Sequence, residues 1–83
     1  MTLDEAVAAV EATLGSADLR VDRRRAREDA SSFLLVVLDT SGGRSAGPIA
    51  NGPRLVDKAS GEVTRLTVPD AVARAERMAP AQS

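Results

Sequence analysis

One continuous run of large apolar residues, Phe33 to Leu38, places the strongest constraint on how this chain can fold. Two serines precede the run, and Asp39 and a Gly-rich stretch follow it. Such a short run is typical of a buried strand, because a helix needs more length. The β-branched residues Val36 and Val37 also favour a pleated conformation. We therefore predict a strand between Ser31-Ser32 and Asp39.

This predicted strand is apolar on both faces. Side chains alternate along a strand, so every second residue points to the same side of the sheet. The two sets are Phe33, Leu35 and Val37 on one face, and Leu34, Val36 and Leu38 on the other. A strand at the edge of a one-sided sheet would not need two apolar faces. We expect a central strand that requires a cover on each side.

The composition excludes several kinds of chemistry. The 83 residues include neither Cys nor His, so a disulfide, a thiolate site and the commonest metal ligand and general base are all absent. No enzyme activity, cofactor or metal is therefore predicted. The alternative is an enzyme that uses the carboxylates Asp39 and Asp57, both at strand ends. A strongly raised carboxyl pKa inside a cleft would support that alternative.

Charge and hydropathy bear on partners and location. The net charge of −1 provides no global field that would attract nucleic acid or an anionic membrane. The first residues lack the basic and apolar regions of a signal peptide. No apolar run approaches the roughly 20 residues that span a bilayer. We expect a cytoplasmic protein with neither a membrane nor a nucleic-acid partner.

The N-terminal segment predicts a helix from Leu3 to Leu14. Thr2 and Glu5 have the spacing of a capping box, and apolar residues then recur at helical intervals up to Gly15, which suits a helix C-terminus. Strict alternation from Asp18 to Asp22 predicts a half-buried strand next.

The segment from Arg23 to Asp29 is rich in arginine. We interpret it as a solvated strand end or a turn. The alternative is a nucleic-acid patch formed by Arg23, Arg24, Arg25 and Arg27. Flanking carboxylates and the lack of stacking aromatics argue against that alternative.

The second half of the chain predicts a hairpin and a helix. Residues 53–57 and 62–67 form the hairpin, with Gly61 at positive φ in the turn and Asp57 accepting a turn amide. A helix follows from Thr67, with Val68, Val72, Ala75 and Ala79 on one stripe. The predicted fold is therefore α+β: an N-terminal helix, a four-stranded, mostly antiparallel sheet and a short C-terminal helix (α-β-β-β-β-α). Residues 1–79 form a single domain and residues 80–83 a frayed tail.

The hairpin segment resembles a known family signature. Residues 50–63 read Ala-Asn-Gly-Pro-Arg-Leu-Val-Asp-Lys-Ala-Ser-Gly-Glu-Val, similar to the YrhB-like family, which is classed with immunity proteins of bacterial polymorphic toxin systems. The matching positions are Asn51, Gly52, Pro53, Val56, Asp57, Gly61 and Glu62. The resemblance implies a small α+β protein that neutralises a toxin, or a small chaperone-like protein, without catalysis.

The predicted function is that of a non-enzymatic protein-interaction module. Two short helices are expected to cover one sheet face and to leave the other for a partner, such as a cognate toxin, or for a second copy of the chain. The candidate interface residues are Leu34, Val36, Leu38 and Ile49. The alternatives are a chaperone-like or accessory protein that acts as a homodimer or binds another client protein, and a monomer whose loop from Gly42 to Gly52 covers the second face with Ile49 as its plug.

Overall fold

The computed structural model describes residues 1–14, 19–39 and 53–81. Two helices and five strands make up this part of the chain. In chain order they are α1 (Leu3–Glu11), β1 (Leu19–Glu28), β2 (Ser32–Asp39), β3 (Arg54–Asp57), β4 (Val63–Arg65), α2 (Val68–Ala75) and β5 (Ala79–Pro80).

The strands form one antiparallel sheet in the order β4-β3-β2-β1-β5. The predicted α+β class is confirmed, and the apolar run is the central strand β2, as its two-sided pattern predicts. The strand count differs, because Ala79 and Pro80 pair with Glu28 and Arg27 of β1. The Ala81 amide also donates to the Ala26 carbonyl at 2.8 Å, so the start of the expected tail is hydrogen-bonded to the sheet.

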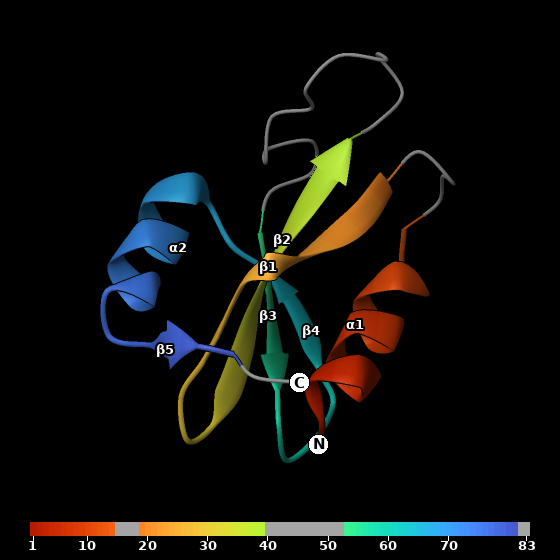
Figure 1. The fold of residues 1–83 in the computed structure, drawn as a ribbon, viewed down its shortest axis with the longest axis horizontal. Coiled ribbons are helices and arrows are strands. Elements are labelled where there is room, and N and C mark those ends of the chain that lie inside the picture. Colours follow the sequence, from red (N-terminus) through yellow and green to blue (C-terminus); the bar gives the residue numbers. More distant parts are fainter. Residues whose placement is uncertain (15–18, 40–52, 82–83) are drawn as a thin grey trace.

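The two helices lie on opposite faces of the sheet (Figure 1). Helix α1 packs its Leu3, Ala6, Val7 and Val10 with Phe33, Leu35, Val37 and Val56. Helix α2 covers the other face, where its Ala71 packs with Leu34 and Met78. The expectation that both helices share one face is therefore wrong. The reason is topological: β4 and β5 are at opposite edges, so the chain between them crosses the face that α1 leaves free.

Local signals at the helix starts act as the sequence predicts. The Thr2 hydroxyl accepts from the Glu5 amide at 3.2 Å, and the Glu5 carboxylate accepts from the Thr2 amide at 2.8 Å, which completes the capping box. Helix α2 begins after Thr67, whose hydroxyl accepts from the Asp70 amide at 3.3 Å. Helix α1 ends at Glu11 and not at the predicted Leu14, and α2 ends at Ala75, before Ala79, which the sequence pattern places on the same helical stripe. Gly15 is outside the described residues.

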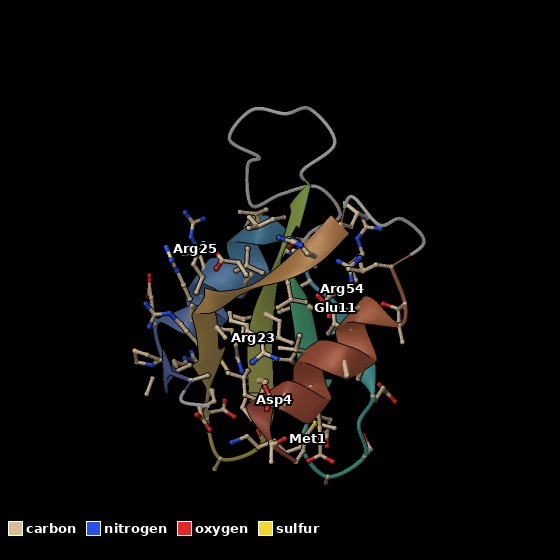
Figure 2. All side chains as sticks on the ribbon, turned by 45° about the vertical axis from the view of Figure 1, so that its right-hand side comes forward. Met1, Asp4, Glu11, Arg23, Arg25 and Arg54 are labelled. Carbon is tan, nitrogen blue, oxygen red and sulfur yellow. The ribbon has the colours of Figure 1, made fainter. Side chains whose placement is uncertain are left out.

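Strand β1 is longer than the sequence predicts. It continues through the arginine-rich segment to Glu28, with a break in register between Asp22 and Arg27. This irregularity lets Ala26 return to the core, where 2% of its surface is exposed. Arg23 reaches across to Asp4 on α1 and forms an ion pair with it (Figure 2). Simple alternation cannot predict a strand with such an irregularity.

The hairpin turn has the predicted geometry. The Asp57 carboxylate accepts from the amides of Ala59 at 2.8 Å and Ser60 at 3.0 Å. Gly61 has φ +77°, a left-handed conformation that side chains with a branched Cβ fit badly.

Gly61→Val is therefore expected to lower the free energy of unfolding by more than about 1 kcal/mol. Urea unfolding followed by circular dichroism measures the change. Gly61→Asn is the matched control, because asparagine tolerates left-handed geometry better, and it should have a smaller effect. Equal midpoints for the valine variant and the wild type would contradict the assignment of strain to this position.

Candidate functional site

A hollow of about 470 Å³ lies between α2 and strands β1 and β2, on the face opposite α1. We call it the α2 hollow. Its lining residues are Arg24, Arg25, Ala26, Arg27, Leu34, Val36, Pro53, Val68, Ala71, Val72, Ala75 and Pro80.

Small side chains on α2 explain why the hollow exists. The helix faces the sheet with Ala71, which is buried, and Ala75, which is half-buried. Alanine is too short to fill the space between a helix axis and a sheet. The larger residues Val68 and Val72 line the hollow but are 47% and 54% exposed. Apolar surface is therefore present at the mouth of the hollow as well as at its floor.

Three arginines from β1 also line the hollow. In a regular strand the neighbours Arg24 and Arg25 would point to opposite faces, but the irregular stretch of β1 brings both to the hollow. Arg25 forms an ion pair with Asp22 at 3.3 Å, and Arg27 donates to the Met78 carbonyl at 3.3 Å. The Arg24 side chain has no ion-pair partner among the described residues. Figure 2 shows Arg25 on the α2 side of the strand and Arg23 on the α1 side.

Hydrogen bonds and an ion pair of Asp29 connect α2 to the turn between β1 and β2. One Asp29 oxygen accepts from the amides of Ser31 at 2.9 Å and Ser32 at 2.8 Å. The other oxygen forms an ion pair with Arg74 of α2 at 3.2 Å. The amide of Ser31, and then that of Ser32 and the Arg74 charge, hold the pKa of Asp29 below its ordinary value. Asp29 thus links the wall of the hollow to the sheet.

We expect Asp29 to stabilise the fold in a pH-dependent way. Because its pKa is lower in the folded state, its contribution is fully present above the ordinary value of 3.8. The contribution is lost as the pH falls through the folded-state pKa. Glu5 and Asp57 have lowered pKa values too, so the wild type alone does not isolate Asp29.

Comparing the wild type with Asp29→Asn by urea unfolding from pH 7 to pH 2.5 separates this contribution. The difference in unfolding free energy should be constant above about pH 5 and should shrink below about pH 4. Glu76→Gln serves as the control for removing one acidic charge from an exposed position. A difference between wild type and Asp29→Asn that does not change with pH would contradict the role of the charged form.

The structure places the four predicted interface residues in different environments. Leu34 is buried beneath α2 with 4% of its surface exposed, so its side chain is not available at the surface. Val36 is half-buried and lines the hollow, whereas Leu38 is half-buried but does not. Ile49 is outside the described residues. The accessible apolar surface is therefore centred on α2 and Val36 and not on the central strand as a whole.

Sequence reasoning missed the exposed valines of α2. Val68 and Val72 lie four residues apart and were predicted to be on the covered stripe of the helix. Ala71 and Ala75 face the sheet, so the predicted covered position is correct for Ala75 and wrong for the two valines. The arginine-rich segment is predicted as a solvated strand end or a turn, with a nucleic-acid patch as the alternative, and neither interpretation places arginines beside an apolar hollow. The sequence signals for this site are the arginine cluster of residues 23–27 and the presence of both valines and alanines on the apolar side of the second helix.

The residues of the hairpin motif have mainly structural environments. Val56 is fully buried, Pro53 is buried and lines the α2 hollow, and Asp57, Gly61 and Glu62 form the turn. Asn51 and Gly52 are outside the described residues. Lys58 pairs with Glu28 at 3.0 Å and lies 4.6 Å from the centre of the Phe33 ring. Asp57, Lys58 and Glu62 therefore belong to a turn and a surface ion pair.

Asp57, one of the two carboxylates that the alternative enzyme would use, belongs to the hairpin turn. Hydrogen bonds from the amides of Ser60 and Ala59 lower the pKa of Asp57, which favours its ionised form. The side chain of Asp39 is outside the described part of the structure. Within residues 1–14, 19–39 and 53–81, no three His, Cys, Asp or Glu side chains lie together as metal ligands. Neither described helix has the length and apolar character needed to cross a membrane.

Comparisons of this chain with protein-family models, with curated proteins and with solved structures give no match. The similarity of residues 50–63 to the YrhB-like signature thus remains a resemblance carried by a short segment. The α2 hollow, with its exposed valines and its arginines, is the structural feature on which a functional proposal can be based.

Proposed function

We propose that this chain is a non-enzymatic protein-interaction module of the immunity-protein type, whose partner docks at the α2 hollow. The proposal is supported first by the apolar mouth of the hollow, where Val68 and Val72 are about half exposed. Burying one such side chain fully contributes roughly 1.5–3 kcal/mol, so even partial burial of both favours association. The resemblance to the YrhB-like signature supports the choice of a toxin as the partner.

The remainder of the fold supports a binding role for this face in particular. On the other side of the sheet, α1 buries its apolar stripe against Leu35, Val37 and Val56, all with 0% exposure. Among the described residues the exposed large apolar side chains are Met1, Val68 and Val72, and the two valines line the α2 hollow whereas Met1 does not. A partner that binds through apolar side chains would therefore bind beside α2.

The test uses the chain as bait for bacterial proteins in three forms. These are the wild type, the double variant Val68→Gln with Val72→Gln, and the control Ala73→Gln with Glu76→Gln. Ala73 and Glu76 are exposed at the same helix but do not line the hollow. Glutamine is a good helix former, so the helix should persist in both variants.

We expect one protein to be retained in stoichiometric amount by the wild type and by the control, and at least tenfold less by the hollow variant. Expression of that partner alone should arrest growth, and co-expression of the wild-type chain should restore it. Equal retention by all three baits would contradict docking at the hollow. A retained partner that does not affect growth would contradict the immunity role and favour a chaperone-like one.

Self-association is separated from partner binding by size-exclusion chromatography with light scattering. A monomer at high concentration is the expected result for a chain whose hollow binds a different protein. A dimer that the double variant abolishes would show that a second copy occupies the hollow, and it would overturn the proposal of a separate partner.

A further inference from the structure

We propose that the α2 hollow selects an acidic, amphipathic peptide segment of the partner, with apolar side chains in the hollow and carboxylates on Arg24 and its neighbours. This inference rests on the proposed function and specifies the chemistry of the partner. It follows from the combination of an apolar floor with a strongly basic wall.

The apolar part of the site determines the size of what can enter. A volume of about 470 Å³ is within the range of small-molecule pockets and accommodates a few side chains. Leu34 and Ala71 form a buried floor, and the half-buried Val36 also lines the hollow. Val68 and Val72, one helical turn apart, present an exposed ridge beside the opening. A segment with apolar residues along one side would bury both the ridge and the opening.

The basic part of the site determines the charge of what can enter. Three arginines and no carboxylate are among the described residues that line the hollow. Asp22 is beside Arg25 and balances that charge, but Arg24 forms no ion pair within the described part of the chain. One guanidinium nitrogen of Arg27 donates a hydrogen bond to the Met78 carbonyl. Charge-assisted hydrogen bonds to a carboxylate are short and strong, so acidic side chains next to apolar anchors complement this wall.

Other occupants fit less well. Two copies related by a two-fold axis through the hollow would bring the same arginines together, and like charges across an interface are unfavourable. Helix α1 has acidic residues, but its Leu3, Val7 and Val10 are already buried in the core and cannot enter another hollow. Single-stranded nucleic acid binds through stacking on aromatic side chains, and Phe33, the one aromatic residue of the chain, is 3% exposed.

The experiment selects binders from a phage-displayed library of random 12-residue peptides. The wild type, Arg24→Glu, and the variant with Val68→Gln and Val72→Gln are used in parallel as immobilised targets. Arg20→Glu is the charge control, because Arg20 is exposed on the same strand and does not line the hollow. Circular dichroism verifies that each target is folded before selection.

We expect the wild type and Arg20→Glu to enrich peptides in which Asp or Glu flank Leu, Ile or Phe. Enriched peptides should bind Arg24→Glu and the double variant at least tenfold more weakly, as measured by fluorescence anisotropy. Their affinity for the wild type should also fall as salt is raised from 0.05 to 0.5 M.

Three results would overturn the inference: no enrichment over a blank support, enrichment of neutral or basic peptides, or binding that Arg24→Glu leaves unchanged. A fatty acid such as laurate that displaces the selected peptides, and binds with a lower Kd than the peptides do, would also overturn the inference and assign the hollow to a lipid.

Neutral peptides that still require Val68 and Val72 would refute the charge selection and leave the proposed protein-binding function intact. That function fails separately, when the bait experiment yields no partner that depends on the two valines.

Discussion

Replacing Leu35 by alanine is expected to lower the free energy of unfolding by about 2–5 kcal/mol. Leu35 is fully buried at the centre of β2, where it packs in the cluster formed with α1. Removing its branched end leaves a cavity that the surrounding helix and strands can fill only in part. A chain of 83 residues has a total stability of roughly 4–12 kcal/mol, so this loss is a large fraction of it.

The matched control is Leu55→Ala on the neighbouring strand β3. Leu55 is half-buried and packs at the side of the α2 cluster, so the same truncation removes less buried surface. Urea unfolding at 25 °C compares the two variants with the wild type, provided that the slope of the transition is unchanged. A smaller effect for Leu35→Ala than for Leu55→Ala would contradict the assignment of the main core to the α1 face.

The parts of the fold that the sequence predicts best depend on local chemistry or on an unambiguous pattern. The capping box of Thr2 and Glu5 and the left-handed Gly61 need only neighbouring residues to form. The central position of β2 follows from its two apolar faces, because no other segment of the chain has them. These features involve no choice between competing long-range arrangements.

The parts that the sequence does not predict depend on long-range pairing. The short strand β5 has no pattern of its own and exists because Ala79 and Pro80 meet the end of β1. The length of β1 is concealed by the irregularity between Asp22 and Arg27, which interrupts alternation. The first feature depends on where the chain runs after α2, and the second depends on how β1 pairs with β2.

The candidate site is predicted only in part, because its position also depends on contacts between segments that are far apart in the sequence. The predicted stripe of α2 contains both valines and Ala75, with Ala71 beside it, and hydrophobic periodicity does not decide which edge of that stripe faces the sheet. In the structure Ala71 faces the sheet, and Val68 and Val72 are at the surface. Val36 was predicted as an interface residue and does line the hollow, whereas Leu34 is covered.

Leu34→Lys is expected to destabilise the protein strongly and to melt well below the wild-type temperature. Leu34 is 4% exposed beneath Ala71 and Met78, so a lysine there loses apolar packing and brings an ammonium group into a largely dry environment. Leu34 is also directly opposite Arg27 in the pairing of β2 with β1, and like charges opposite each other destabilise a sheet. Together these effects should exceed about 3 kcal/mol, at the upper end of single-substitution effects.

Val72→Lys is the control: it introduces the same side chain at the mouth of the hollow, where the valine is 54% exposed. This variant should remain folded. Leu34→Asp should be less destabilising than Leu34→Lys, because its carboxylate faces Arg27 instead of repeating its charge. Circular dichroism and thermal unfolding rank the three variants. If Leu34→Lys melts at the wild-type temperature, α2 does not cover Leu34, and the second face of the sheet is open as a whole. The docking surface would then extend over the central strand and would not be confined to the α2 hollow.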